Sequence, residues 1–150
     1  MLRSRIIPCL LVHDDGLMKT ELFKSGKYLG DPINAVKIFN EKEADELLVL
    51  DIDKTVQGKS PNMDFIQSLA NECRMPLCYG GGITTAEQAV QIISLGVEKV
   101  ALSSAAINDL SLCDSIASVI GKQSVVVVLD VRKALLGRGY NVFTHNGTRK

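Results

Sequence analysis

Five short apolar runs recur along the chain, each is followed by polar or glycine residues, and the first four lead on to a segment with helical features. The runs begin about 25 to 40 residues apart, the spacing of strands that alternate with helices. Strands that are apolar along their whole length are buried on both faces, as in parallel sheets covered by helices. The predicted strands cover residues 5–12, 46–51, 75–79, 99–102 and 124–129. The pattern therefore predicts an α/β fold with a parallel sheet.

Helices are predicted between these strands. Asp31 followed by Pro32 is a helix N-cap with proline at the first helical position, so a helix begins there and runs to about Lys42. The other predicted helices cover residues 65–71, 84–95 and 110–120. Residues 13–31 are polar and contain glycine, so we expect a loop between the first strand and the first helix.

The pattern changes after Asp130. Residues 140–144 alternate between polar and apolar side chains, and the following His145-Asn146-Gly147 is a turn signal. We therefore predict that residues 133–150 form a loop containing a short β-hairpin. Residues 1–150 are expected to form a single partial (β/α) barrel with about five of the eight units of a complete one. Strands one and five would then both be open edges.

Polar and glycine residues follow the carboxyl ends of the predicted strands, where active sites form in parallel α/β folds. These residues are Asp51, Gly80, Gly81, Gly82, Ser103, Ser104 and Asp130. No helix start carries a P-loop lysine, and no GxGxxG pattern follows the first strand. A (β/α) barrel is therefore favoured over a dinucleotide-binding fold.

The glycine triplet Gly80 to Gly82 stands between a predicted strand and a predicted helix. Glycines let a backbone approach a ligand closely, and free N–H groups at a helix start favour anions. The triplet therefore indicates a phosphate-binding loop. A tight turn without a ligand is the alternative.

The charge balance argues against a nucleic-acid or acidic-membrane partner, because 17 Lys and Arg residues face 17 Asp and Glu residues. No apolar run is long enough to span a bilayer, and the apolar run after Arg5 is too short for a secretory signal. We therefore expect a cytosolic protein.

Four cysteines are scattered along the chain without CxxC spacing. Such cysteines are expected to be buried, reduced thiols rather than zinc ligands or disulfide partners. They are Cys9, Cys73, Cys78 and Cys113. No metal site and no organic cofactor is indicated.

Several stretches together resemble the cyclase subunit of imidazole glycerol phosphate synthase, over the whole of residues 1–150. They are Arg5-Ile6-Ile7-Pro8-Cys9-Leu10, Gly30-Asp31-Pro32, Asp45-Glu46-Leu47 with Leu50-Asp51-Ile52, Gly80-Gly81-Gly82-Ile83, Glu98-Lys99-Val100 and Val127-Val128-Leu129-Asp130. The resemblance implies the first half of a TIM barrel plus strand five and the following hairpin. It also implies an enzyme of the lyase type in histidine biosynthesis.

In that family the barrel takes ammonia from a glutaminase partner and cyclises a bis-phosphorylated ribulosyl-formimino nucleotide. The resemblance implies that Asp130 is one of two catalytic carboxylates and that Lys19 contacts the substrate. It further implies one phosphate site lined by Asp51, Gly81, Gly82, Ser103 and Ser104. The family usually carries Asn-Thr at the serine pair, and both pairs can donate hydrogen bonds.

Three charged residues flank strands that are otherwise apolar, and they match the gate through which ammonia enters the opposite end of the family's barrel. They are Arg5, Glu46 and Lys99. Ion pairing at the bottom of the barrel is the simpler interpretation, because a buried charge must be paired. Glu98 matches a position at the glutaminase interface, and a solvated surface charge is its alternative.

Leu11 departs most from the family, because it stands where the second catalytic carboxylate is expected. General acid–base chemistry needs two titratable groups, and leucine supplies neither. His13 and Asp14 lie near in sequence, but a strand alternates its faces, so neither is assumed to replace the carboxylate. Asp53 and Lys54 add charge where the family has small residues, which suggests a changed substrate pocket.

Barrel homologues associated with surface-polysaccharide genes resemble this chain more closely, in the Leu10-Leu11 strand end and in Phe23-Lys24. They are thought to pass ammonia to a sugar amidotransferase in lipopolysaccharide biosynthesis. Three hypotheses follow: a synthase subunit that still cyclises its substrate, a non-cyclising ammonia conduit, and a half-barrel that folds only as an oligomer covering its edge strands.

Overall fold

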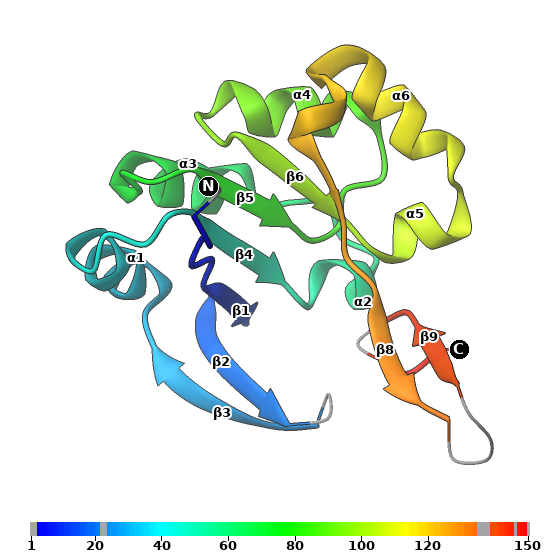
Figure 1. Ribbon diagram of the computed structural model, residues 1–150, viewed down its shortest axis with the longest axis horizontal. Helices are drawn as coiled ribbons and strands as arrows, with labels where there is room; N and C mark the ends of the chain where they lie inside the picture. The colour runs from blue at the N-terminus through cyan, green and yellow to red at the C-terminus, as the bar shows by residue number, and fades with distance from the viewer. Residues whose placement is uncertain (1–2, 22–23, 135–138, 146, 150) are drawn as a thin grey trace.

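The computed structural model describes residues 3–21, 24–134, 139–145 and 147–149. A curved sheet carries helices α1, α3, α4 and α6 along its outer side, and a two-stranded hairpin projects from one end (Figure 1). The strands are β1 (Cys9–His13), β2 (Gly16–Glu21), β3 (Lys24–Gly30), β4 (Leu47–Asp51), β5 (Leu77–Gly80), β6 (Lys99–Leu102), β7 (Val125–Val127), β8 (Asp130–Lys133) and β9 (Tyr140–Phe143).

The main sheet has the strand order β3-β2-β1-β4-β5-β6-β7. Strands β1, β4, β5, β6 and β7 run parallel to their neighbours in this series, and each parallel pair is separated in sequence by at least one helix. The predicted α/β class with a parallel sheet is therefore confirmed.

The helices follow the predicted order. Asp31 caps α1 as expected, because its Oδ1 accepts a hydrogen bond from the Asn34 N–H at 2.9 Å. Two short helices after β4 and β6 were not expected from the sequence. The helices are α1 (Pro32–Glu41), α2 (Lys54–Gln57), α3 (Met63–Glu72), α4 (Ala86–Ser94), α5 (Ser104–Asn108) and α6 (Ser111–Ile120), with a 3-10 turn at Lys122–Ser124.

The loop expected over residues 13–31 is wrong, since these residues form the antiparallel strands β2 and β3. Asp14 and Asp15 have φ angles of 47° and 58°, which suit the two-residue turn of a β-hairpin. Strand β2 pairs with β1, so β1 is not the open edge that we expected. The edge is β3 instead.

Both ends of the parallel series are shorter than predicted. The first strand begins at Cys9 rather than Arg5, because Pro8 has no N–H for the ladder and only its carbonyl accepts a bond, from Leu48 N–H at 2.9 Å. The fifth strand stops at Val127, and its neighbour Val128 donates one last hydrogen bond to the Leu102 carbonyl.

Asp130 does not close the fifth strand but begins β8, which pairs with β9. The predicted hairpin therefore exists, but it starts before residue 133. Beyond β9, Thr144 bridges to Arg149 around the predicted turn, of which His145 and Gly147 are described. Asn146 of that turn and Phe23 of the earlier motif lie outside the described residues.

The hydrophobic core lies between the sheet and the helices. Leu47, Val49 and Val100 are completely buried on the sheet side, and Ile66 and Ile92 on the helix side. Successive strand residues point to opposite faces, so Leu48 and Leu50 face the other, concave side. The core thus fixes which residues turn toward that side.

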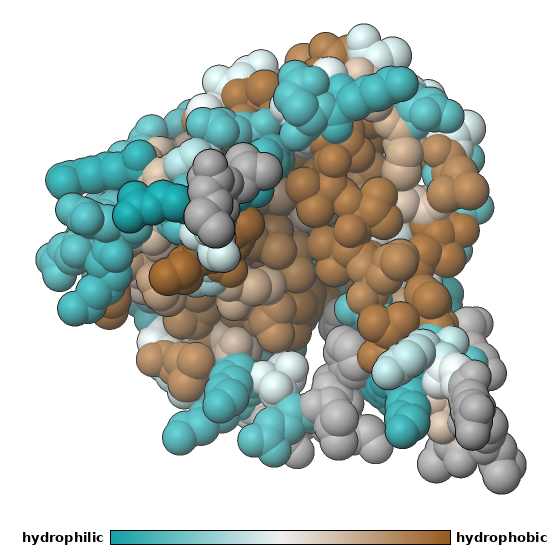
Figure 2. Space-filling view, in the orientation of Figure 1, coloured by the Kyte–Doolittle hydropathy of each residue, from teal (hydrophilic) through white to brown (hydrophobic). Residues whose placement is uncertain are grey.

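Figure 2 shows apolar side chains over the middle of the molecule, where Figure 1 places β7 and the start of β8. Val127, Leu129 and Val131 are exposed apolar residues of this segment. None of the helices formed by the described residues has the length and apolar character needed to cross a membrane.

Candidate functional site

A pocket of about 180 Å³ lies at the carboxyl end of the parallel strands, which we call the first pocket. Its lining combines loops that follow β4, β5, β6 and β7, and it therefore forms where active sites of parallel α/β folds are found. The lining residues are Leu11, Thr20, Leu50, Asp51, Ile52, Thr55, Gly80, Gly81, Gly82, Ile83, Ala101, Leu102, Ser103, Ser104, Ala105, Val128, Asp130 and His145.

One row of the sheet forms part of this lining. Leu11 pairs with Leu50, Leu50 with Gly80 and Gly80 with Ala101, so the four residues stand side by side on adjacent strands. Parallel neighbours in register point to the same face, which places this row on the concave side. The row is apolar throughout, including Leu11 at the position where a carboxylate was expected.

Asp51 lines the pocket, but its carboxylate is already engaged by its own loop. Its Oδ1 accepts hydrogen bonds from the Asp53 and Lys54 N–H groups at 3.1 and 3.3 Å. Its Oδ2 lies 3.4 Å from the Lys54 ammonium. Asp51 therefore holds the turn into α2 and fixes the position of Lys54.

The glycine loop packs closely against that turn. A Cβ on Gly81, whose φ is +135°, would lie 2.5 Å from the Asp51 carbonyl oxygen. A Cβ on Gly82, whose φ is +71°, would lie 2.4 Å from the Lys59 carbonyl oxygen and 2.7 Å from the Lys54 Cβ. These two glycines are thus required by contacts within the protein, whether or not a ligand binds beside them.

Ser103 and Ser104 follow β6 and line the same pocket. Ser104 is buried, and its hydroxyl accepts a hydrogen bond from the His145 N–H at 3.3 Å. His145 also lines the pocket, although the sequence suggested only a turn there. In the sequence, only a histidine next to a turn signal hinted at a role for His145. Its contact with Ser104 could not be predicted, because the two residues are 41 positions apart.

Asp130 is the first residue of β8, and it lines the first pocket. Partial burial raises the pKa of its carboxyl, and the nearby Arg132 opposes that rise. A carboxyl group with a raised pKa is suited to acid–base chemistry near neutral pH. The pocket thus contains one titratable group of the expected kind.

Lys19 is not among the residues that line the first pocket. It lies in β2, opposite Lys27 of β3, and is exposed. Its neighbour Thr20 lines the pocket instead, because adjacent strand residues point to opposite faces. The structure therefore brings six of the seven predicted catalytic and substrate residues together and leaves Lys19 outside.

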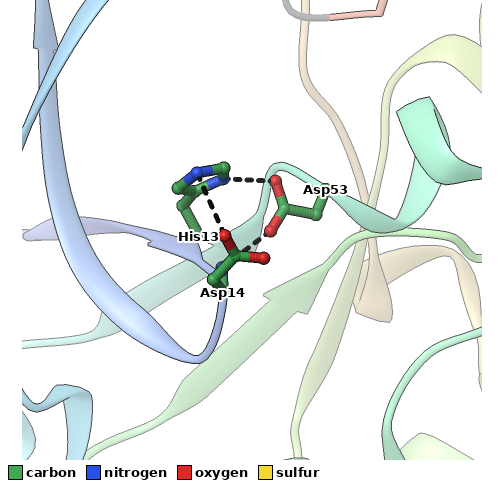
Figure 3. A group of neighbouring side chains, drawn as sticks. All are labelled: His13, Asp14 and Asp53. Carbon is green, nitrogen blue, oxygen red and sulfur yellow. Dashed lines mark hydrogen bonds and ion pairs between the residues drawn. The ribbon is translucent and has the colours of Figure 1, made fainter.

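A second polar cluster joins the end of β1 to the turn before α2 (Figure 3). The His13 Nδ1 lies 2.6 Å from the Asp53 Oδ1, and its Nε2 lies 3.5 Å from the Asp14 Oδ2. The Asp53 Oδ2 accepts the Asp14 N–H at 2.7 Å. The three side chains are close enough to share a metal ion, but the two Asp53 oxygens already have protein partners.

The three predicted gate residues meet at the opposite end of the sheet. The Glu46 carboxylate lies 2.6 Å from the Lys99 ammonium and 3.2 Å from the Arg5 guanidinium. Glu46 is buried, whereas Arg5 is exposed. Glu98 is exposed beside this cluster in sequence, and its N–H donates to the Leu77 carbonyl at 2.9 Å.

The cysteines are free thiols in the described part of the chain. Burial raises the pKa of the Cys78 thiol to about 12, so it is protonated at neutral pH. The expectation of burial is wrong for Cys9, which is exposed, because it points to the open concave side of β1.

The sequence matches the family described as histidine biosynthesis protein over residues 5–150. A protein of Leptospira borgpetersenii named "Putative imidazole glycerol phosphate synthase subunit HisF" is 58% identical over 150 residues, which are 100% of this chain and 59% of that protein. "Putative imidazole glycerol phosphate synthase subunit hisF2" of Pseudomonas aeruginosa is 57% identical over 99% of this chain and 59% of its own length.

"Imidazole glycerol phosphate synthase subunit HisF" of Exiguobacterium sibiricum is 38% identical over 149 residues, again 99% of this chain and 59% of that protein. The chain thus spans about three fifths of the length of these curated relatives.

Proposed function

The chain belongs to the histidine biosynthesis protein family, a family of (β/α)8 barrels, and from that premise we propose that it acts as a cyclase subunit of imidazole glycerol phosphate synthase. In this role it takes ammonia from a partner glutaminase. It then forms imidazole glycerol phosphate and an aminoimidazole carboxamide ribotide from a phosphoribulosyl-formimino precursor.

The observation that carries the proposal is the composition of the first pocket. Its lining unites Asp130 with all five phosphate-site residues suggested by the resemblance, although they come from loops after four different strands. These five are Asp51, Gly81, Gly82, Ser103 and Ser104. A catalytic carboxylate beside hydrogen-bond donors is the arrangement that acid–base chemistry on a phosphorylated substrate needs.

Asp130 is the acid–base residue in this proposal. Burial raises the pKa of its carboxyl, which makes it a stronger proton acceptor than an exposed aspartate. Ser103 and Ser104 supply hydroxyl donors for the substrate. Leu11 and Leu50 give this side of the pocket an apolar lining, and because Leu11 supplies no carboxylate, Asp130 takes both proton-transfer steps alone.

The charged cluster at the other end supports ammonia entry. Glu46, Leu48 and Leu50 follow one another on the concave side of β4, so the row that begins at the cluster ends in the pocket. The four residues from Glu46 to Leu50 advance about 13 Å along the strand, which places the two ends a short diffusion path apart. Arg5, Glu46 and Lys99 are the proposed gate.

The proposal is tested by ammonium-dependent turnover of the precursor in the wild type, Leu11→Asp and Asp130→Asn proteins. We expect turnover in the wild type, a rise in Leu11→Asp because a second titratable group is restored, and a loss of about 100-fold or more in Asp130→Asn. Absence of turnover in both the wild type and Leu11→Asp would contradict the proposal.

The second candidate is a non-cyclising ammonia conduit that serves a sugar amidotransferase of lipopolysaccharide biosynthesis. Leu11 favours it, since the proposed gate is kept while the acid–base partner of Asp130 is missing. This candidate predicts a glutaminase complex that weakens when Glu98 or Lys99 is reversed in charge. If no glutaminase associates with the protein, the conduit is excluded.

A further inference from the structure

Asp130 stands on a hairpin that lies outside the main sheet. Strands β8 and β9 form a separate two-stranded sheet, which projects from one end of the molecule (Figure 1). Asp130 is the first residue of β8 and pairs with Phe143 of β9. The position of its carboxylate in the first pocket therefore depends on how this hairpin is attached to the rest of the protein.

The segment that leads into Asp130 is attached to the end of β6. The Val128 N–H donates a hydrogen bond to the Leu102 carbonyl at 2.8 Å, two residues before Asp130. The next residue, Leu129, is 51% exposed. A single anchor of this kind does not fix the direction of the hairpin, so a second one is needed to hold the Asp130 carboxylate in one place.

The second attachment point is a turn that follows β9. The Thr144 N–H donates to the Arg149 carbonyl at 2.7 Å, and the Arg149 N–H donates to the Thr144 carbonyl at 3.1 Å. His145 and Gly147 lie within this turn and have φ angles of 52° and 72°. The two reciprocal hydrogen bonds close the turn on itself, so a contact that holds the turn also holds the end of β9.

Ser104 accepts a hydrogen bond from this turn. The His145 N–H, two residues after Phe143, donates to the Ser104 Oγ at 3.3 Å. Ser104 is 7% exposed and is the first residue of α5, so its own position is fixed by the packing at the end of β6. A hydroxyl can accept one hydrogen bond and still donate its proton, so Ser104 keeps a donor for the ligand of the first pocket.

We propose that Ser104 is a positioning residue for Asp130, because Leu102 and Ser104 together hold both strands of the hairpin at the carboxyl end of β6. Leu102 holds the segment before β8, and Ser104 holds the turn after β9. Asp130, His145 and Ser104 all line the first pocket, so the second anchor and the carboxylate lie in the wall of the same pocket. The inference rests on the proposed function for the role of Asp130.

Two NMR measurements test this role without any substrate: hydrogen exchange of the His145 amide and the pH titration of the Asp130 carboxyl carbon. In Ser104→Ala we expect the His145 amide to exchange about fivefold faster, as for the loss of one hydrogen bond. Burial raises the pKa of Asp130 and Arg132 opposes the rise, so release of the hairpin should lower that pKa. Ser104→Thr keeps the hydroxyl and should restore both values to those of the wild type. Ser103→Ala removes a neighbouring pocket hydroxyl without this bond and is the matched control for both measurements.

Gly147→Val provides an independent variant, because Gly147 has a φ of +72° and is not part of the lining of the first pocket. A valine there strains the turn that holds His145 and should cause the same two changes. Where turnover is measured, kcat should fall about tenfold or more while KM stays within about threefold, since the carboxylate is misplaced and the ligand contacts remain.

An unchanged Asp130 titration in a folded Ser104→Ala or Gly147→Val protein would overturn the inference, as would an unchanged exchange rate of the His145 amide in Ser104→Ala. Absence of turnover in the wild type and Leu11→Asp proteins, with both NMR changes present, would contradict the proposed function and leave the positioning of Asp130 by Ser104 standing.

Discussion

The Nδ1 of His13 and the Oδ1 of Asp53 lie 2.6 Å apart, although the two residues are separated by 40 positions. The second Asp53 oxygen accepts the Asp14 N–H, so one buried carboxylate holds both the end of β1 and the first residue of the following turn. This pair therefore joins the β1–β2 hairpin to the turn into α2, which carries Lys54.

The pair predicts a pH-dependent stability. The hydrogen bond to Asp53 raises the pKa of His13, so its stabilising effect is fully present below the unfolded pKa of about 6.5 and is lost as pH rises through the folded value. Thermal unfolding should show a larger loss of Tm for His13→Gln at pH 5.5 than at pH 8.5. Asp53→Asn should show the same trend.

The half-buried His145 is the matched control, because its two ring nitrogens lie beside the Thr144 hydroxyl and the Arg149 guanidinium instead of a carboxylate. His145→Gln should change Tm by a similar amount at both pH values. An equal loss of Tm for His13→Gln at pH 5.5 and 8.5 would contradict the ionic contribution of the His13–Asp53 pair.

Much of the sheet could be predicted because its parallel strands are continuous apolar runs. The first long helix could be predicted because its cap, Asp31 before Pro32, is a local sequence signal. The β2–β3 hairpin was missed because an edge hairpin is solvated, so Lys19, Glu21 and Lys27 hide the apolar alternation that marks a buried strand. The Asp14-Asp15 turn offered only a weak signal, since aspartate adopts positive φ less readily than glycine.

The candidate site was predictable where residues follow strand ends, because parallel strands bring their carboxyl ends together. The contacts of Asp53 with His13 and of Ser104 with His145 were not predictable, because the residues of each pair lie about 40 positions apart in sequence. Lys19 lies outside the first pocket for a local reason, because neighbouring strand residues point to opposite sides and Thr20 faces the pocket.

Lys99 and Arg5, the two cations that pair with Glu46, should contribute unequally to stability. The exposed fractions of the side chains are 6% for Glu46, 23% for Lys99 and 60% for Arg5. Lys99→Met leaves a buried carboxylate with one exposed partner and should lower the free energy of unfolding by about 2 kcal/mol. Arg5→Met should cost less than about 1 kcal/mol, as for exposed ion pairs.

Urea denaturation of the two single variants measures this difference. The double variant Lys99→Met with Glu46→Gln removes the unpaired charge and should recover part of the lost stability. A larger loss in Arg5→Met than in Lys99→Met would contradict the assignment of Lys99 as the main partner of Glu46.

Replacing Tyr79 by phenylalanine should stabilise the protein. Its side chain is completely buried, and its hydroxyl has no hydrogen-bond partner among the described residues. Burial raises the pKa of Tyr79, with Asp51 and Asp15 adding to the rise, so the group is neutral but still desolvated. Tyr79→Phe should raise the free energy of unfolding by about 1 kcal/mol, because a buried unpaired hydroxyl is lost.

The exposed Tyr140 is the control for Tyr79. Chemical denaturation of Tyr140→Phe should give a change within about 0.5 kcal/mol, as for most surface substitutions. A destabilised Tyr79→Phe protein would show that the hydroxyl has a bound partner in solution.

Replacing Asp130 by asparagine should have opposite effects on stability and on turnover. Burial raises the pKa of its carboxyl, so the stability linked to its protonated form is present below about pH 3.9 and is lost as pH rises through the folded pKa. Asp130→Asn keeps the shape without the charge, and its Tm should therefore exceed that of the wild type at pH 7 and equal it near pH 3.5. The same variant should lose ammonium-dependent turnover. An aspartate retained only for structure would show the reverse, a lower Tm at pH 7, so thermal unfolding at the two pH values separates a catalytic carboxylate from a structural one.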